Sequence, residues 1–536
     1  MSVLPDLELL DLEVIYPNQM LLDYLNRKKP MVDFFTNKYL DLHKVSFTGD
    51  RSILKEILLD YNKKIDASQE VISNIESIEN EKILFVVTGQ QPGFLTGPLY
   101  TIYKTLSAIN YAEKYSTEKL KLIPIFWNAS EDHDVEEVNH IKILDKQNEI
   151  QSFLYDDKSI LGKSLEKCKL NKQKQESLIT EVFEALPTTD FTDELFDGIV
   201  KKELNKAKYW GELFSRIMSR LMGKWGLILV EPIIFRPYLI DYFSKLISEP
   251  IKYNRIFLET TNKLGEIGYQ PKMHKKEEVV GLFYIDEKQR RNNITQITEN
   301  EYSIDNGENL SKDDLLDKLQ SDPSLFSTNA IYRPLAQDLM IPTHIFVGGP
   351  SEISYHIQLM DLYKEFSLTQ PNLLFRMGAT VIERHINRII EKYQFNITEL
   401  RNVSQLTNNL LRNENKEFLS PYFDKIKNTL DELNQDLGKI NQELAQRAEG
   451  RKKSVLKELT NIERMFLKYV KDDNEVLTNQ LAKGNAYLFP DNKPQERIFN
   501  IFQYLNKYSL NILNCMKDHL GKTEPGNHVV LKCWMF

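Results

Sequence analysis

The sequence predicts an α/β protein with a parallel β-sheet in its core and an α-helical coiled coil towards its C-terminal end. Short apolar runs that end in polar or glycine-containing turns before helical patterns indicate buried parallel strands. Apolar residues at alternating spacings of three and four after residue 418 indicate the coiled coil. The chain has 536 residues, which is enough for several domain-sized units.

The composition is that of an ordinary globular protein, with 41% hydrophobic and 27% charged residues. The net charge of −8 argues against nucleic acid as the main partner, because such binding usually needs a basic domain. The N-terminus has no signal-peptide pattern, and no apolar run is long enough to span a membrane. Three widely separated cysteines without a CxxC motif favour reduced thiols in a cytoplasmic protein.

Residues 1–80 have an amphipathic helical pattern, and residues 82–127 predict a βαβ unit. Ile83–Val87 is a continuous apolar run, as expected for a strand buried on both faces. The helix that follows has one apolar face, made of Leu99, Ile102, Tyr103, Leu106 and Ile109. Leu122–Trp127 is the next strand, parallel to the first and reached by a right-handed crossover.

Later apolar runs predict further strands at 227–230, 281–285 and 342–347. Residues 150–220 are charged and less periodic, and we expect a helical insertion there. Residues 286–314 are polar and predict loops and short hairpins. The strand at 342–347 leads into the turn Gly348–Glu352, which opens another helix.

The coiled-coil seam consists of Phe423, Ile426, Leu430, Leu433, Leu437, Ile440 and Leu444. The pattern breaks at Arg447–Gly450 and resumes at Val455. The two runs predict either an antiparallel hairpin or a longer helix that pairs with a second subunit, and the seam favours a homodimer. The C-terminal residues are expected to turn globular again, with an amphipathic helix to His519 and a strand at Val529–Leu531.

The turn at 88–98 is the first place where the sequence indicates chemistry. Gly89, Gly93 and Gly97 allow a ligand to approach the backbone closely, and Pro98 suits the first position of a helix. Free N–H groups at that helix start would favour an anion, and Lys104 lies on the same face. The alternative is a tight turn with a surface lysine. Neither the P-loop nor the GxGxxG pattern is present.

The second place is Glu131–Asp134, three acids and an imidazole directly after a strand. We expect these residues to open a helix in which His133 neighbours Glu137, and Glu136 neighbours His140. His133 and Asp132 would suit a general base and its orienting partner. Two alternatives stay open: a divalent-metal site that includes Asp134, and an acidic helix cap.

A third strand, turn and helix of the same kind includes Gly348–Glu352, and Arg333 precedes it. Arginine suits bidentate binding of a carboxylate or phosphate, although a surface ion pair is the simpler explanation. Ligands of open α/β sheets lie at the carboxyl ends of the strands. We therefore expect these three segments to border one substrate crevice.

The chain resembles the BshC family, the cysteine-adding enzyme of bacillithiol biosynthesis. The first block of the resemblance is Gly89–Lys104, with the letters GQQPGFLTGPLYTIYK. The other blocks are Pro124–Trp127 with Glu131–Asp134 and Glu137–His140, Arg333–Leu335 with Gln337–Asp338, Gly349–Glu352 with Tyr355, and Gln495–Arg497. Pro92, Ser351 and His356 depart from the family pattern, in which Ala, Gly and Trp are frequent at these positions.

The resemblance implies a Rossmann-like core, similar to nucleotidyltransferase and class I aminoacyl-tRNA synthetase cores. That core would span residues 1–390, with inserted segments at about 150–220 and 286–325. A coiled-coil arm at 391–475 would form a homodimer, and 476–536 would pack back on the core. The implied reaction joins the carboxyl group of cysteine to the amine of glucosaminyl-malate.

Forming an amide from a free carboxylate is uphill in water, so the carboxyl must be activated, and ATP with Mg²⁺ is the expected activating group. The candidate catalytic residues are His133, Asp132, Asp134 and Lys104. The candidate substrate- or nucleotide-binding residues are Gly89, Gln90, Gln91, Gly93, Thr96, Gly97, Trp127, Ser130, Glu131, Glu137, His140, Arg333, Gln337, Gly349, Glu352 and Tyr355. A metal-dependent hydrolase or deacetylase that uses Asp132, His133 and Asp134, and a non-catalytic dimeric scaffold, remain as alternatives.

Overall fold

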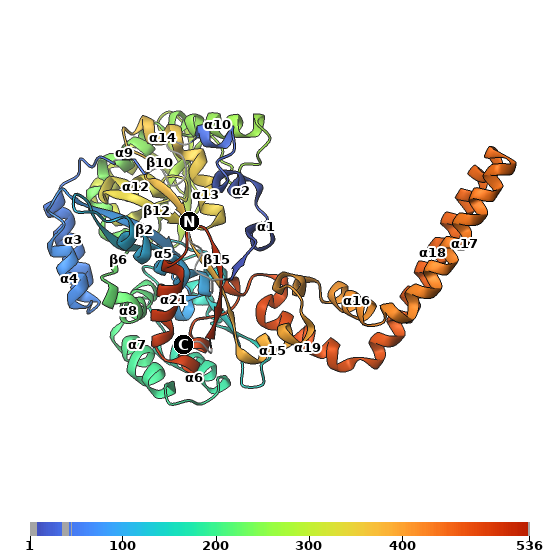
Figure 1. Ribbon diagram of the computed structural model, residues 1–536. Helices are drawn as coiled ribbons and strands as arrows, with labels where there is room; N and C mark the ends of the chain where they lie inside the picture. The colour runs from blue at the N-terminus through green and yellow to red at the C-terminus, as the bar shows by residue number, and fades with distance from the viewer. Residues whose placement is uncertain (1–7, 35–41, 44, 534–536) are drawn as a thin grey trace. The chain divides into compact units, whose positions relative to one another are not determined.

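A computed structural model describes residues 8–34, 42–43 and 45–533 of the chain (Figure 1). The chain divides into two compact units. The first combines the described parts of Met1–Thr380 with Glu496–Leu531, and the second is mainly Val381–Gln495. The residues after 496 therefore belong to the same unit as the N-terminal part of the chain.

A five-stranded sheet forms the centre of the first unit, in the order β13-β12-β2-β3-β6. Its strands are β2 (Ile83–Gln90), β3 (Lys121–Asn128), β6 (Ile228–Val230), β12 (Thr343–Gly348) and β13 (Asn372–Phe375). All four pairings are parallel. The chain runs from β2 outwards to β3 and β6, then crosses to the other side of β2 for β12 and β13. The Rossmann-like core is therefore confirmed.

The strands of this sheet consist of apolar residues because helices cover them. Every residue of β2 from Ile83 to Gly89 is buried. Helix α5 (Leu99–Tyr115) connects β2 to β3 and packs on β2, β3 and β12, while α21 (Asn511–Gly521) packs on α5. The βαβ unit predicted from residues 82–127 is confirmed.

A second five-stranded sheet is antiparallel, in the order β10-β9-β8-β7-β11. Its strands are β7 (Val279–Ile285), β8 (Arg291–Thr298), β9 (Glu301–Ile304), β10 (Asn309–Ser311) and β11 (Phe326–Thr328). The predicted strand at 281–285 exists, but it belongs to this sheet and not to the parallel core. The hairpins expected within 286–314 are β8 to β10, and α11 (Lys312–Ser321) follows them.

The chain forms two smaller sheets as well. One is the hairpin of β4 (His140–Leu144) with β5 (Ile150–Leu154), and the other has the order β1-β15-β14. Its strands are β1 (Leu9–Leu10), β15 (His528–Lys532) and β14 (Gly378–Ile382). The predicted C-terminal strand is thus confirmed, and the predicted helix before it is split into α20 (Phe502–Tyr508) and α21.

The other helices of the first unit surround these sheets. They are α1 (Leu12–Ile15), α2 (Gln19–Leu25), α3 (Arg51–Lys64), α4 (Gln69–Glu76), α6 (Lys172–Ala185), α7 (Lys202–Lys206), α8 (Trp210–Met222), α9 (Ile240–Ser248), α10 (Pro250–Glu266), α12 (Arg333–Met340), α13 (Pro350–His356) and α14 (Met360–Glu365). The insertion expected within 150–220 is largely helical, as α6 to α8 show. Among the described residues, none of the helices is both long and apolar enough to cross a membrane.

The second unit is helical, and its longest part is an antiparallel hairpin of α17 (Lys416–Ile440) and α18 (Gln442–Asp473) (Figure 1). The Phe418 and Phe466 rings stack across it, with centroids 5.8 Å apart. The shorter helices are α15 (Arg384–Tyr393), α16 (Val403–Glu414) and α19 (Glu475–Leu488).

The chain turns within the hairpin at Asn441, whose side chain accepts hydrogen bonds from Glu443 N and Leu444 N and so caps α18. The predicted break at Arg447–Gly450 is wrong, because these residues lie inside α18. An asparagine in an extended conformation is a preferred N-cap, so α18 begins directly after Asn441.

Candidate functional site

The carboxyl ends of β2 and β12 mark the point where the strand order reverses, and open α/β sheets bind ligands at such a point. The predicted turns follow these strands directly, since Thr88 of β2 pairs with Val347 of β12 and Gly89 pairs with Trp127 of β3. The sequence therefore placed the 88–98, 128–140 and 348–352 segments correctly at one edge of one sheet.

A buried ion pair joins the two sides of this switch point. Lys104 Nζ, on α5, lies 2.5 Å from Glu352 Oε2, on α13, and it also donates to Gly89 O and to Gln90 Oε1. The same Glu352 oxygen accepts the Gly349 N–H at 2.8 Å. The Lys104 side chain is 1% exposed, and burial lowers its pKa against the opposing effect of Glu352. Lys104 is thus a buried residue and not the surface lysine of the alternative interpretation.

The turn after β2 is held from inside the protein. A Cβ on Gly93 would lie 2.6 Å from Gly97 Cα, so this close approach requires glycine. The first N–H of α5, at Leu99, donates to Phe499 O at 2.8 Å. Asn500 Nδ2 donates to Gly97 O at 2.7 Å. The predicted anion site of free N–H groups is therefore wrong at Leu99, because a backbone carbonyl already occupies its N–H.

The segment after β3 is not the predicted helix. It contains only a short 3₁₀ turn at Val135–Glu137 before β4 begins at His140. Asp132 and Glu137 both accept hydrogen bonds from Gln91 Nε2, at 2.6 and 2.8 Å, and so the acids bind a neighbouring turn instead of capping a helix. The predicted helical pairing of His133 with Glu137 is wrong for the same reason, and His140 is an exposed residue of a hairpin.

A cavity of about 400 Å³ lies beside the end of β3. Its lining includes four of the predicted residues, namely Glu131, Asp132, His133 and Arg333. The rest of the lining comprises Ala129, Met273, His274, Phe283, Arg291, Thr328, Asn329, Ala330 and Ile331, several of them from the antiparallel sheet. The volume lies within the range of small-molecule sites.

Arg291, the first residue of β8, was missed by the sequence analysis and is the most connected residue of the cavity. Its Nε donates to Ser327 Oγ at 2.8 Å, and its Nη2 donates to Thr328 O. Its Nη1 lies 3.4 Å from His133 Nδ1 and 3.5 Å from Asp132 Oδ1. Only a basic residue in a polar stretch marks this position in the sequence, and such positions are usually solvated.

The adjacent acids Glu131 and Asp132 differ in their electrostatics. Burial raises the pKa of Glu131, which Arg291 and Arg236 offset only in part. Burial acts in the same direction on Asp132, but Arg291 and the Gln91 hydrogen bond outweigh it and lower the pKa of Asp132. Two neighbouring carboxyl groups with opposite shifts are suited to different roles in proton transfer.

Arg333 lies at the start of α12 and is held by two of the other predicted residues. Its Nη1 donates to Gln337 Oε1 and its Nη2 to Tyr355 Oη, both at 3.0 Å. Burial raises the pKa of Tyr355, which Arg333 opposes. The structure therefore brings Arg333, Gln337 and Tyr355 together and places the first of them against the cavity.

Three other predicted residues are buried beneath the site. Trp127 stacks on Phe235 with ring centroids 5.7 Å apart, Ser130 is fully buried, and Thr96 lies inside the turn after β2. None of the three lines the cavity described above. Their positions are those of supporting residues.

The structure also bears on the metal alternative. Among the described residues, no group of three or more His, Cys, Asp or Glu side chains has an arrangement that could hold a metal ion. Asp134, the third member of the proposed cluster, is exposed and does not line the cavity.

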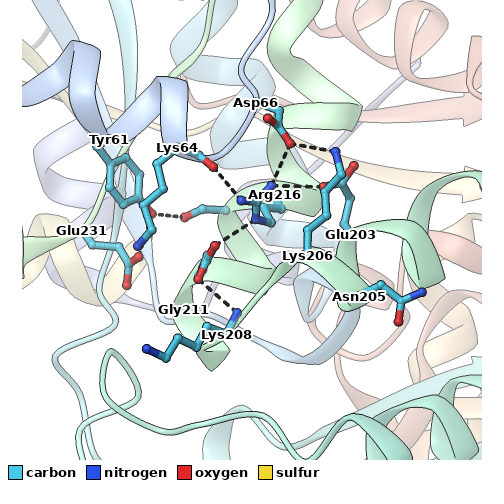
Figure 2. A network of polar contacts seen from close by, with 12 residues as sticks. Tyr61, Lys64, Asp66, Glu203, Asn205, Lys206, Lys208, Gly211, Arg216 and Glu231 are labelled. Carbon is cyan, nitrogen blue, oxygen red and sulfur yellow. Dashed lines mark hydrogen bonds and ion pairs between the residues drawn. The ribbon is translucent and has the colours of Figure 1, made fainter.

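A buried polar network lies below the ends of β3 and β6 (Figure 2). Tyr61 Oη donates to Glu231 Oε1 at 2.7 Å and lies 2.9 Å from Ser215 Oγ. Burial raises the pKa of Glu231 to about 7. A Cβ on Gly211 would lie 2.3 Å from Glu231 Oε2, so α8 can approach this carboxyl group only through glycine.

In the same figure Arg216, in the following turn of α8, connects this helix to Asp66 in the loop after α3 (Figure 2). Its Nε donates to Glu212 at 3.0 Å, and its Nη1 donates to Asp66 at 3.0 Å. The network fixes α8 against the loop after α3, below the strand that ends in the site residues.

A second buried cluster includes a residue of the fourth sequence block. Arg376 Nη1 donates to Glu496 Oε2 at 2.8 Å, and Tyr16 Oη donates to Glu496 Oε1 at 2.5 Å. His528 Nδ1 lies 3.2 Å from Tyr16 Oη. Burial lowers the pKa of His528 to about 4. The cluster connects residues from both ends of the sequence within the first unit.

Comparison with known proteins gives two family matches. The model described as "Bacillithiol biosynthesis BshC, N-terminal Rossmann-like domain" matches residues 7–377. The model described as "Bacillithiol biosynthesis BshC, C-terminal coiled-coil domain" matches residues 379–533. Together the two matches cover nearly the whole chain.

Similar proteins occur in several Bacillus species, and each carries the name "Putative cysteine ligase BshC". A Bacillus cereus protein is 28% identical over 540 residues, which is 97% of this chain and 99% of the relative. A Bacillus thuringiensis protein is 28% identical over 542 residues, with the same coverage. A Bacillus cytotoxicus protein is 28% identical over 511 residues, which is 92% of this chain and 93% of the relative.

Proposed function

The chain belongs to the BshC family of bacillithiol biosynthesis, and from that premise we propose that it joins the carboxyl group of cysteine to the amine of glucosaminyl-malate. The family and the ligase class agree with the resemblance seen in the sequence. The substrates and the order of chemical steps are the proposal.

One observation carries the proposal. The cavity of about 400 Å³ brings Asp132 and His133, from the second sequence block, against Arg333, from the third. A carboxylate, an imidazole and a guanidinium in one cavity can bind an anionic substrate and assist attack by an amine. Arg291 adds a second guanidinium that the sequence blocks do not include.

Arg333 is the residue that we propose for the malyl carboxylates. Its side chain is partly buried, and the hydrogen bonds to Gln337 and Tyr355 fix its orientation. A fixed guanidinium binds a carboxylate with little further loss of side-chain entropy. The charge of Arg333 is retained despite burial, because Tyr355 and Glu352 keep its pKa raised.

We propose ATP with Mg²⁺ as the co-substrate that activates the cysteine carboxyl. When bound, it supplies a phosphate-containing leaving group for amide formation. Arg291 is the cationic residue of the cavity that we propose for its phosphates, since Arg333 is assigned to the malyl carboxylates. The N-terminus of α5 does not fit them, because the Leu99 N–H is bonded to Phe499 O. Lys104 does not reach them either, since Glu352, Gly89 and Gln90 surround its ammonium group.

We also propose a second copy of the chain as the partner of the α17–α18 hairpin. Packing of the two helices on each other leaves apolar residues of the seam in solvent, including Leu433 at 54%, Ile440 at 77% and Ile462 at 52% exposure. A heptad seam that stays exposed after the hairpin has formed is complementary to another seam of the same kind.

The proposed function is tested with purified protein, glucosaminyl-malate, cysteine and ATP, followed by mass spectrometry of the thiol formed. Bacillithiol that forms only when all three compounds are present supports the proposal, and the phosphate-containing by-product identifies the activation chemistry. Thiol profiling of cells that lack the gene is the independent arm. Accumulated glucosaminyl-malate without bacillithiol is expected, and an unchanged thiol profile would contradict the proposed function.

A further inference from the structure

We infer that Arg291 is a positioning residue that holds His133 as a neutral hydrogen-bond donor, so that His133 stabilises the oxygen of the reacting carboxyl and does not take a proton. The role expected from the sequence was that of a general base with Asp132 as its partner. This inference rests on the proposed function for its chemistry, but its structural part is independent of any substrate.

The contact between the two side chains fixes the direction of the hydrogen bond. Arg291 Nη1 lies 3.4 Å from His133 Nδ1. A guanidinium has donors and no acceptor, so the ring nitrogen that faces it must carry a lone pair. A neutral imidazole with its lone pair on Nδ1 carries its proton on Nε2.

The orientation of Arg291 is determined by groups other than His133. Nε donates to Ser327 Oγ at 2.8 Å, Nη2 donates to Thr328 O, and the Phe283 ring centroid lies 4.1 Å from the guanidinium carbon. The Arg291 side chain is 5% exposed. A guanidinium held at three points cannot turn away to make room for a proton on His133 Nδ1.

Asp132 is the competing partner for Nδ1, and the geometry disfavours it. Asp132 Oδ1 lies 3.6 Å from His133 Nδ1, which is beyond hydrogen-bond distance. That oxygen already accepts the backbone N–H of His133 at 2.8 Å. The arrangement of an ionised carboxylate that orients a basic imidazole is therefore absent from this pair.

Some charged groups around His133 lower its pKa and others raise it. Burial and Arg291 lower the pKa of His133, whereas Asp132 and Asp134 oppose them, and the net direction is downwards. Glu131, His274 and Arg333 line the same cavity. His133 is thus neutral at neutral pH, as a donor of this kind requires. Among the described residues no hydrogen bond is found at Nε2, and the His133 side chain is 38% exposed, so this N–H is available to a ligand.

The proposed step balances as follows. The amine nitrogen forms the C–N bond, and the π pair of the carbonyl moves to the oxygen, which accepts a hydrogen bond from His133 Nε2–H. The pair returns as the bond to the phosphate-containing leaving group breaks, and that group departs with the bonding electrons. The proton of the amine passes to Glu131, a carboxylate of the same cavity whose Oε1 also accepts Thr328 Oγ1–H at 3.2 Å.

The first experiment is ¹⁵N NMR of histidine-labelled full-length protein without substrate, with the His133 signals assigned from the His133→Gln variant. We expect an unprotonated Nδ1 and a protonated Nε2 at neutral pH. Arg291→Met should give a mixture of tautomers and a raised His133 pKa. Arg290→Met, a change of the exposed arginine next to it, should leave the wild-type pattern. A protonated Nδ1 in the wild-type protein overturns the inference, whether or not any variant folds.

The second experiment uses activity and separates the two roles of His133. Gln retains an N–H donor but cannot act as a base. The activity of His133→Gln should therefore be about tenfold or more above that of His133→Ala. Glu131→Gln should lower kcat by about 100-fold with little change in KM. Equal loss in His133→Gln and His133→Ala, with an active Glu131→Gln, would contradict the assignment. If the wild-type protein makes no bacillithiol, the proposed function fails, while the NMR result still decides the tautomer.

Discussion

Lys104 Nζ lies 2.5 Å from Glu352 Oε2, and this pair connects the helix after β2 with the helix after β12 across the switch point of the parallel sheet. It also reaches the ends of both strands, since Lys104 donates to Gly89 O and Glu352 accepts the Gly349 N–H. The pair thus fixes the spacing of the two turns between which a ligand of this fold would lie.

Breaking this pair should destabilise the first unit. Lys104→Met and Glu352→Gln should each lower the free energy of unfolding by about 3 kcal/mol, because each leaves the other group of a largely buried pair without its countercharge. The double variant should lose less than the sum of the two single losses, by about 1 kcal/mol or more. Chemical denaturation of the four proteins measures this coupling.

The control for that cycle lies on the same helix. Lys114 pairs with Glu524 at 3.0 Å in solvent, and Lys114→Met should change the free energy of unfolding by less than about 1 kcal/mol. Additive losses in the Lys104 and Glu352 variants would show that the two groups do not act as a pair.

Gly211 should not tolerate a side chain. The Cβ of Gly211→Ala would lie 2.3 Å from Glu231 Oε2 and 2.8 Å from Ser130 Cβ, so either α8 or the buried carboxyl group must move. We expect a loss of about 1–3 kcal/mol in the free energy of unfolding. Gly265→Ala, in α10, has no atom within 4 Å of the new Cβ and should be neutral or slightly stabilising. Equal melting temperatures for the two variants would contradict this interpretation of the network in Figure 2.

Glu231 should make the protein less stable as the pH rises through neutrality. Burial raises its pKa to about 7 from an ordinary value of 4.5, so between these values the folded state binds the proton that the unfolded state releases. Its contribution is therefore fully present below pH 4.5 and is lost as the pH rises through about 7. Glu231→Gln should remove this loss and melt higher than wild type at pH 8. Thermal melts from pH 5 to pH 8 test this, and parallel curves for both proteins would refute it.

His528 should make the protein less stable as the pH falls below neutrality. Its pKa is about 4 in the folded state and 6.5 ordinarily, so the unfolded state binds a proton that the folded state refuses between these values. Its stabilising effect is complete above pH 6.5 and declines as the pH falls to about 4, by up to about 3 kcal/mol. His528→Gln should show a shallower decline in denaturation measured from pH 7 to pH 4. His140→Gln, at an exposed position, should keep the wild-type slope.

The exposed seam of the hairpin should determine the oligomeric state. Leu433→Glu places a charge at a seam position that is 54% exposed in the single chain, and we expect light scattering to show a shift from dimer to monomer. Ile297→Glu, at a position in β8 that is 57% exposed, should leave the mass unchanged. A wild-type protein that is monomeric at all concentrations would remove the basis of the proposed dimer.

The periodicity of apolar residues predicted the parallel strands and the coiled coil because burial determines both patterns. β2 and β3 are mostly apolar because nearly all of their residues are buried, and the hairpin has a seam because only one stripe of each helix is covered. The strand at 281–285 looked the same as a core strand, since composition alone does not reveal which sheet a buried strand joins.

The site was less predictable because its groups come from separate parts of the chain. Asp132 follows β3 and could be identified from its place after a strand, but its partners Gln91 and Arg291 come from another turn and from another sheet. The acids after β3 suggested a helix start through the helix dipole. In the structure Asp132 makes tertiary contacts instead. No local sequence pattern distinguishes an acid that caps a helix from one that makes tertiary contacts.

The hydrogen bond from Leu99 to Phe499 can form only late in the synthesis of the chain. The turn after β2 leaves the ribosome long before Phe499 and Asn500, the residues that complete it, are made. At elongation rates of about 5–20 residues per second the delay is on the order of 20 s or more. During that time water must satisfy the Leu99 N–H and the Gly97 carbonyl. A nascent chain that stops before Glu496 would therefore lack a finished site, even though all five strands of the parallel sheet had already emerged.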